Sequence, residues 1–123
     1  MLRASLAILS LGLSWAGAAP AAQPATLRVD YVHSGNALVD HYALDRVVEE
    51  ALPWPGNLAQ SIDTLELGAY FFDVVDPATG RVFYSRGFSS VFGEWQTTEE
   101  AQRLDRAFGE SLRFPKPDQP VRV

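Results

Sequence analysis

Residues 81–98, RVFYSRGFSSVFGEWQTT, decide the fold of this chain. Their aromatic side chains are Phe83, Tyr84, Phe88, Phe92 and Trp95. Only Gly87 and Gly93 interrupt this series of large apolar rings, and such a density of rings is typical of a domain core. The stretch holds no nucleophile beside a base and no metal-ligand spacing, so it predicts a core and not an active site.

The runs that flank this stretch predict a hairpin in a two-layered β domain. Residues 70–76 and 81–86 are rich in aromatic and β-branched side chains, and Pro77-Ala-Thr-Gly80 joins them with residues that favour turns. Phe71 and Phe72 are adjacent and must point to opposite faces of their strand. We therefore expect both faces to be at least partly covered, which favours two packed layers over a single open sheet.

Period-2 alternation predicts two strands earlier in the chain. In residues 26–33 one face carries Leu27, Val29 and Tyr31. In residues 41–50 one face carries Tyr42, Leu44 and Val48, and the other carries Asp45 and Glu49. A helix also fits the second segment at a 3.6-residue period, but its β-branched content and the lack of a cap favour a strand.

The rest of the chain predicts one helix and more strands. Thr97 and Glu100 form a capping box, which predicts a short helix from Thr97 to about Arg106. Residues 108–114 alternate as a strand, with Phe108, Glu110, Leu112 and Phe114 on one face, and residues 121–123 predict the start of another. The predicted fold is mostly β, an antiparallel β-sandwich-like domain with one short helix that lacks its last strands.

The N-terminus predicts export. Arg3 precedes an apolar run over residues 6–15, and Ala16-Gly-Ala18 supplies the small residues of a cleavage site. We assign residues 1–19 to a signal peptide, 20–25 to an Ala/Pro-rich linker and 26–123 to one domain, with cleavage after Ala18 or Ala21. The apolar run is too short to span a membrane. The predicted location is the periplasm, the cell surface or the medium, with no membrane span after cleavage.

Composition restricts the partners. The 123 residues carry a net charge of −5 and include no cysteine, so the sequence excludes disulfides and makes nucleic acid a poor partner. Removal of Arg3 with the signal peptide would make the mature chain more acidic still. An acidic surface on an exported protein mainly promotes solubility.

The sequence predicts no catalytic residue, metal site or cofactor. The two histidines, His33 and His41, do not stand in a His-Glu-x-x-His motif, so we expect surface positions at strand ends, with joint metal binding across a hairpin as the weaker alternative. Asp73, Asp76 and Thr79 suit a calcium site, but Asp76 more simply accepts backbone hydrogen bonds in the turn.

Other polar residues in the aromatic stretch receive structural interpretations. Glu94 requires a partner if it is buried, and we expect it to pair with Arg86. Ser89 and Ser90 have no neighbouring base and are expected to satisfy turn hydrogen bonds. Trp54, between Pro53 and Pro55, is expected to fold onto the sheet as a plug, with sugar stacking as the alternative.

The segment that begins Tyr84-Ser-Arg-Gly-Phe and continues to Glu99-Glu-Ala101 resembles a signature of the non-catalytic N-terminal domain of the bacterial IgA-metallopeptidase family, number sixty-four among metallopeptidases. Four more segments resemble the same domain in the same order: Val29–Asn36, Leu52–Asn57, Ile62–Leu65 and Glu110–Pro115. The residues that we assign to the structural signature are Arg86, Gly87, Phe88, Phe92, Gly93, Glu94, Trp95 and Trp54.

The resemblance implies an exported, non-catalytic β-sandwich-like accessory domain that precedes a zinc endopeptidase domain. Its implied partners are that catalytic domain and a protein or glycan substrate. Family members continue into further strands and the zinc motif, which implies that this chain is a fragment, a split reading frame or a free-standing partial module. The alternative function is a stand-alone binding module for glycan or protein that uses Trp54.

Overall fold

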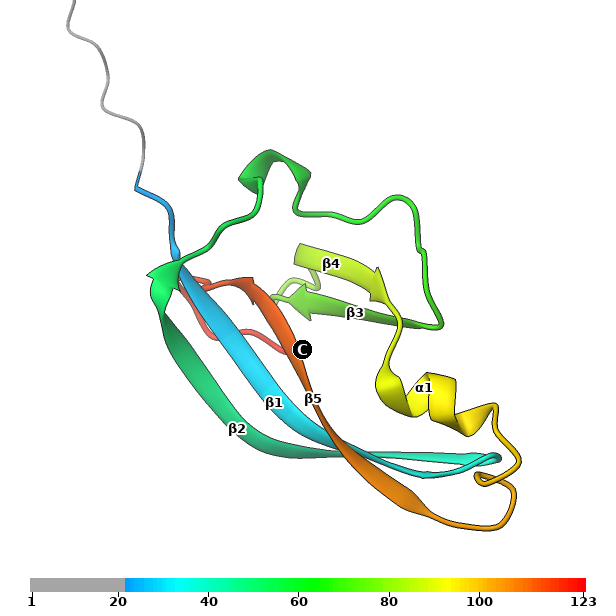
Figure 1. The fold of residues 1–123 in the computed structure, drawn as a ribbon. Coiled ribbons are helices and arrows are strands. Elements are labelled where there is room, and N and C mark those ends of the chain that lie inside the picture. The colour runs from blue at the N-terminus through cyan, green and yellow to red at the C-terminus, as the bar shows by residue number, and fades with distance from the viewer. Residues whose placement is uncertain (1–21) are drawn as a thin grey trace, which may run out of the picture.

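The computed structural model describes residues 22–123 (Figure 1). The expected signal peptide lies outside the described residues. The elements are β1 (Ala25–Asn36), β2 (Val39–Pro53), a 3₁₀ turn η1 (Leu58–Gln60), β3 (Tyr70–Val75), β4 (Val82–Phe88), α1 (Val91–Gln96) and β5 (Arg106–Pro115). No helix within residues 22–123 has the length and hydropathy needed to cross a membrane.

β1 is the central strand of an antiparallel three-stranded sheet in the order β2-β1-β5. The long hairpin of β1 and β2 confirms the strand prediction for residues 41–50, because β2 runs through that whole segment. On the outer face of the sheet, Arg28 binds Asp30 at 2.7 Å and Glu50 at 3.0 Å, and Arg113 of β5 binds the same Glu50 oxygen at 3.0 Å. These ion pairs connect all three strands on the face that points away from the core.

A β-bulge in β2 changes which residues face the core. Leu44 lies opposite Tyr31 and Arg46 lies opposite Asp30, so Asp45 is an extra residue in the ladder. Beyond the bulge Val47 lies opposite Val29, on the same face as Leu44, whereas Val48 lies opposite Arg28 on the outer face. The predicted grouping of Val48 with Tyr42 and Leu44 is therefore wrong, since simple alternation does not anticipate an inserted residue.

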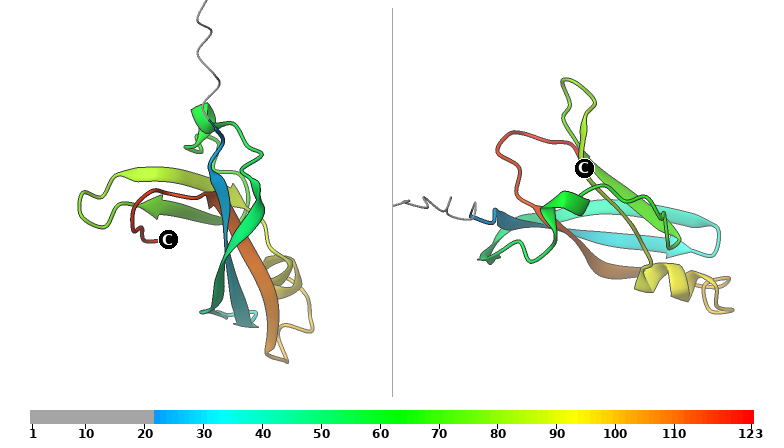
Figure 2. Two further views of the ribbon diagram at one scale, coloured as in Figure 1. Left: turned by 90° about the vertical axis from the view of Figure 1, so that its left-hand side faces the viewer. Right: turned by 90° about the horizontal axis from the view of Figure 1, so that it is seen from above.

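β3 and β4 form the predicted hairpin and the second layer. The connecting turn ends at Gly80, whose φ of 74° lies in the left-handed region that favours glycine. Figure 2 shows the hairpin lying across the strands of the larger sheet at a steep angle, with α1 covering a different part of the same face. One face of the three-stranded sheet is thus covered by the hairpin near one end and by α1 near the other.

The core between the layers is built around Val74, Tyr84 and Phe114, which are almost completely buried. The residues that pack on this cluster are Leu27, Val29, Trp54, Phe72 and Val121. This arrangement confirms the β-sandwich-like prediction. The far face of β3 is less covered than expected, because Phe71 remains 50% exposed while Phe72 points into the core.

The helix lies earlier in the chain than the capping box suggests. α1 starts after Ser90, whose Oγ accepts a hydrogen bond from the Gly93 amide at 3.0 Å, and ends at Gln96. Thr97 is the C-cap of this helix and not an N-cap, and the residues after it form turns. The prediction of a helix starting at Thr97 is wrong, because Ser90 caps first and places Phe92 in the core.

The last residues add a single bridge to the second layer. Val75 and Arg122 exchange two backbone hydrogen bonds, of 2.8 Å and 2.9 Å, in an antiparallel bridge. The expectation that residues 121–123 begin a strand agrees with this bridge. Ala25, expected to lie in the linker, is the first residue of β1.

Candidate functional site

A cluster of polar and aromatic side chains surrounds His33 on the central strand β1, beneath α1. His33 is 0% exposed and lies on the core face of β1. Its ring stacks on Phe92 of α1 with a centroid distance of 3.8 Å and on Tyr42 of β2 at 4.4 Å, while Tyr70 meets its edge at 5.3 Å. The expected surface position for His33 is therefore wrong, and the imidazole is instead enclosed by aromatic rings.

Each nitrogen of the His33 ring faces a carboxylate. Nδ1 lies 3.1 Å from Glu110 Oε2, and Nε2 lies 3.2 Å from Asp40 Oδ2. A neutral imidazole donates from only one nitrogen, so both contacts are hydrogen bonds only when both nitrogens carry a proton. His33 thus connects β1 to β5 through Glu110 and to β2 through Asp40.

Glu110 of β5 accepts hydrogen bonds from two other elements, β1 and α1. Its Oε2 also accepts from the Tyr31 hydroxyl at 2.8 Å, and its Oε1 accepts from the Phe92 amide at 3.1 Å. Burial alone would raise the pKa of Glu110, but these bonds and the one to His33 outweigh burial and hold the pKa below its ordinary value. Burial, followed by the bond to Glu110, raises the pKa of Tyr31.

Asp40 extends the network to the surface. It accepts from the Tyr42 hydroxyl at 3.3 Å and from the side-chain amide of Gln96 at the end of α1. Burial, with the nearby Asp40 charge as the second cause, raises the pKa of Tyr42 to about 12. Because His33 has no exposed surface, the network can fix α1 on the sheet but offers no reactive nitrogen to a substrate.

The alternation in the sequence already implied a polar group in this layer. Glu110 lies between Phe108 and Leu112 on the same face of β5, as the period-2 pattern requires. Tyr31 and His33 likewise continue the core face of β1. Glu110 was not among the predicted site residues. Its position within an apolar series on one face of the strand was the feature that indicated a buried acid.

The two histidines do not meet. The hairpin register places Tyr42 opposite His33 and Ser34 opposite His41, so the two imidazoles lie on opposite faces of the sheet. His41 is exposed. Within the described residues 22–123, no group of three or more His, Cys, Asp or Glu side chains is arranged to hold a metal ion.

The predicted pairing of Glu94 with Arg86 is wrong. Glu94 is exposed on α1, where the helix turns its side chain away from the core. Arg86 instead donates to the Tyr84 hydroxyl, at 3.2 Å from Nε and 3.1 Å from Nη2. Glu110 is a buried acid, with a side chain that is 8% exposed, whereas the exposed Glu94 requires no partner.

The two signature glycines permit close packing. A Cβ at Gly87 would lie 2.4 Å from the Leu67 carbonyl oxygen, and a Cβ at Gly93 would lie 2.6 Å from the Tyr70 ring. The Gly87 amide also donates to Asp63 Oδ2 at 2.6 Å, which holds the loop before β3 against β4. These contacts account for glycine at both positions without any catalytic role.

The signature aromatic residues are packing residues. Phe92 is 0% exposed under His33, and Trp95 packs beside Phe92 with ring centroids 5.5 Å apart while its indole donates to Glu100 at 2.7 Å. Phe88 lies against Tyr70 at a centroid distance of 5.6 Å.

Trp54 lies against the core cluster, as the plug interpretation predicted. Its ring meets the Tyr84 ring edge to face at a centroid distance of 5.6 Å. A Cβ at Gly56 would lie 2.6 Å from the indole nitrogen, so the backbone of the loop covers the other part of the ring. This packing favours a structural role over a platform for sugars.

In the turn after β3, nearby groups of the same turn donate hydrogen bonds to the Asp76 carboxylate. Asp76 accepts from the Ala78 amide and from the Thr79 hydroxyl, both at 2.8 Å. These hydrogen bonds lower the pKa of Asp76, the Thr79 hydroxyl contributing most. Asp76 therefore acts as the turn residue that the simpler sequence interpretation expected.

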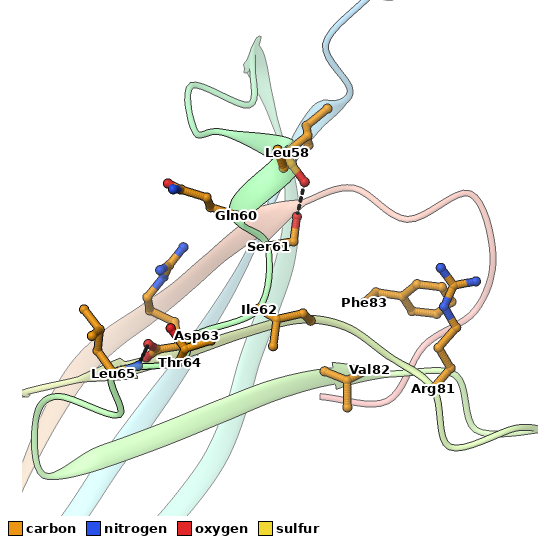
Figure 3. Close-up of a pocket in the computed structure, with 12 residues that line it drawn as sticks. Leu58, Gln60, Ser61, Ile62, Asp63, Thr64, Leu65, Arg81, Val82 and Phe83 are labelled. Atoms are coloured by element: carbon orange, nitrogen blue, oxygen red, sulfur yellow. Dashed lines mark hydrogen bonds between the residues drawn. The ribbon is translucent and has the colours of Figure 1, made fainter.

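A hollow of about 690 Å³ lies between the loop that follows η1 and the start of β4 (Figure 3). Ile62 and Asp63 line it from the loop, and Arg81, Val82 and Phe83 line it from the β4 side. Asp63 is already engaged, since its Oδ1 accepts from the Leu65 amide at 2.8 Å. The hydrogen bonds from Gly87 and Leu65 lower the pKa of Asp63, which marks it as a clamp for the loop.

A second, more apolar hollow of about 510 Å³ opens between β2 and β3, and we call it the intersheet groove. Its floor includes Val29, Phe72 and Leu112. Its rim consists of large side chains that are half or more exposed: Tyr42, Leu44, Val47, Phe71 and Val123. An apolar rim of this kind is typical of an interface with another polypeptide.

Comparison with known families identifies one match. Residues 20–123 match the family described as Peptidase M64 N-terminus. A comparison with curated proteins gave no match.

Proposed function

We propose a function for this chain from its family and its surface. The chain belongs to the Peptidase M64 N-terminus family, whose members are accessory domains of metallopeptidases. We propose that it supports a catalytic domain by docking through the intersheet groove. The observation that carries this proposal is the apolar rim of the groove. Leu44 is 68% exposed, Tyr42 58% and Val47 54% on one strand. A strand that exposes three large side chains on one face resembles one half of a domain interface.

Among the described residues that line the groove, none is charged. The ion pairs of Arg28 and Arg113 occupy the outer face, and the Arg46 guanidinium binds Asp30 there at 2.9 Å. The groove therefore presents apolar surface with little competing charge, and burial of that surface would contribute about 25 cal/mol for each Å². This distribution supports docking of a folded domain more than the binding of a charged substrate.

The domain could act by stabilising the catalytic domain or by positioning its substrate, and measurements of stability and of KM distinguish these two roles. We propose support as the main role, so loss of groove contacts should lower the thermal stability of the catalytic domain. If the groove positioned substrate, loss of the same contacts would raise KM at unchanged stability.

The test joins the chain to the catalytic domain of a family peptidase and compares two variants. Leu44→Ser removes a groove contact, and Leu104→Ser is a matched control because Leu104 is 52% exposed and does not line the groove. We expect Leu44→Ser to lower the Tm of the catalytic domain and Leu104→Ser to leave it unchanged. Equal Tm values for both variants and the parent would overturn the proposal.

We also propose that the protein is exported, on the support of the charged, apolar and small-residue pattern in residues 1–19. Expression in a bacterial host followed by N-terminal sequencing of the protein outside the cytoplasm tests this. We expect a mature N-terminus after Ala18 or Ala21. Recovery of protein that still starts at Met1, all of it inside the cell, would contradict export.

A further inference from the structure

The edge of β3 that faces away from β4 already has one partner. Val75 donates to the Arg122 carbonyl at 2.8 Å and accepts from the Arg122 amide at 2.9 Å. In an antiparallel ladder the residues that exchange both bonds recur at every second position. The backbone groups of Asp73 and Phe71 therefore point to the same edge as those of Val75.

The two edges of the β3–β4 hairpin differ in how far other segments cover them. On the β4 side, Ser85 donates to the Ser61 carbonyl at 3.0 Å and Gly87 donates to Asp63 at 2.6 Å, so the preceding loop covers that edge. Within residues 22–123, no comparable hydrogen bond reaches the outward backbone groups of Phe71 or Asp73. An uncovered strand edge is a template for another strand.

The uncovered edge borders the intersheet groove. The bridge register places Val123 opposite Val74, whose side chain points to the core, and Val123 itself lines the groove. A strand that continued this register would place alternate side chains over the groove. The edge and the groove are thus two parts of one surface.

We propose that the edge of β3 binds one further antiparallel β-strand, formed by the polypeptide that follows Val123 when this domain precedes another. This inference rests on the proposed docking function and names the element that docks. The first and third residues after Val123 pair with Asp73 and Phe71. The second and fourth residues point into the groove toward Phe72 and are apolar.

The position of Arg122 favours a continuing strand over a second copy of the chain. Arg122 already occupies the edge at Val75, so a polypeptide attached to Val123 starts in register beside Val74. Such an attached strand binds at a high effective concentration, whereas a second copy would have to pair beside the Arg122 bridge from solution.

The experiment extends the full chain by six residues after Val123. One extension has valine at the second and fourth positions and threonine elsewhere, and a matched control has the same residues with the valines at the first and third positions. A third form has proline at the first and third positions, which removes the amides that should pair with Asp73 and Phe71. The measurement is amide hydrogen exchange by NMR on each form.

We expect the first extension to slow exchange of the Phe71 and Asp73 amides at least tenfold relative to the unextended chain. The control with shifted valines should give a smaller effect, and the proline form none. Equal exchange in all forms would overturn the proposal, as would protection on β2 in place of β3. Protection that grows with protein concentration in the unextended chain would also overturn it, since a second copy would then be the occupant.

Failure of this inference is distinguishable from failure of the proposed function. If Leu44→Ser lowers the Tm of the catalytic domain but no extension protects β3, the domain docks without adding a strand. If the extension protects β3 but no groove variant affects the catalytic domain, the strand completes the fold and the docking function fails.

Discussion

His33 and Glu110 lie 3.1 Å apart, Nδ1 to Oε2, on neighbouring strands in a layer otherwise filled by aromatic rings. Glu110 also accepts a hydrogen bond from the Phe92 amide, so this one carboxylate connects β1, β5 and α1. A buried carboxylate with this many donors stabilises the fold only while all of its bonds are intact.

Glu110→Gln should destabilise the domain. The amide keeps the size of the side chain, but its NH₂ group cannot accept from Tyr31 or His33, so at least one buried donor loses its partner. We expect the free energy of unfolding to fall by about 1–3 kcal/mol in urea titrations.

Glu94→Gln is the matched control for that change. Glu94 is exposed on α1, so the same substitution there should alter the free energy of unfolding by less than about 0.5 kcal/mol. A larger loss at Glu94 than at Glu110 would mean that Glu94 is the paired acid, as the sequence first indicated.

Much of the fold follows from period-2 patterns, and the exceptions have local causes. The hairpin of β3 and β4 was predicted from its two aromatic and β-branched runs and the turn residues between them, and the strand at 108–114 was predicted from its alternation. The bulge at Asp45 was not, since an inserted residue leaves no mark in composition. The helix was misplaced because two cap sequences compete, and burial of Phe92 selects Ser90.

The buried polar layer was missed for a different reason. Sequence spacing cannot show that His33 and Glu110, far apart in the chain, become neighbours on adjacent strands. The candidate residues were predicted mainly from the aromatic stretch, because its residues are clustered in sequence. The polar partners of the layer come instead from β1, β2 and β5.

Asp63→Asn should destabilise the domain at neutral pH but not in acid. The hydrogen bonds from Gly87 and Leu65 lower the pKa of Asp63 below its ordinary value of 3.8. A lowered pKa means that the ionised carboxylate stabilises the fold fully above the unfolded pKa, and this stabilisation is lost as the pH falls through the folded pKa.

Urea titrations of both proteins between pH 7 and pH 2.5 check this. The difference in free energy of unfolding should be constant from neutral pH down to about pH 4 and shrink below it. A difference that grows in acid would contradict the assignment of Asp63 as an ionised clamp.

Gly87→Ala should be destabilising where Gly109→Ala is not. A Cβ at Gly87 would lie 2.4 Å from the Leu67 carbonyl oxygen, and that oxygen belongs to backbone that cannot rotate away. We expect a loss of about 1–3 kcal/mol, typical of overpacked sites. At Gly109 no atom lies within 4 Å of the added Cβ, so thermal unfolding should show an unchanged or slightly higher Tm.

Trp54→Ala separates the structural role of this residue from the glycan-binding alternative. The indole packs on Tyr84 at a centroid distance of 5.6 Å and beneath Gly56, so its removal leaves a cavity beside the core. Because the ring is half-buried, we expect a loss of about 3 kcal/mol, the lower end of the range for Trp→Ala.

A platform for sugars would respond in the opposite way. Trp54→Ala would then keep the free energy of unfolding close to that of the parent and abolish binding in a glycan array. Leu104→Ala, a truncation at an exposed position, sets the baseline for both measurements. Since loss of stability and loss of glycan binding are measured independently, the pair of results assigns Trp54 to the core or to a binding surface.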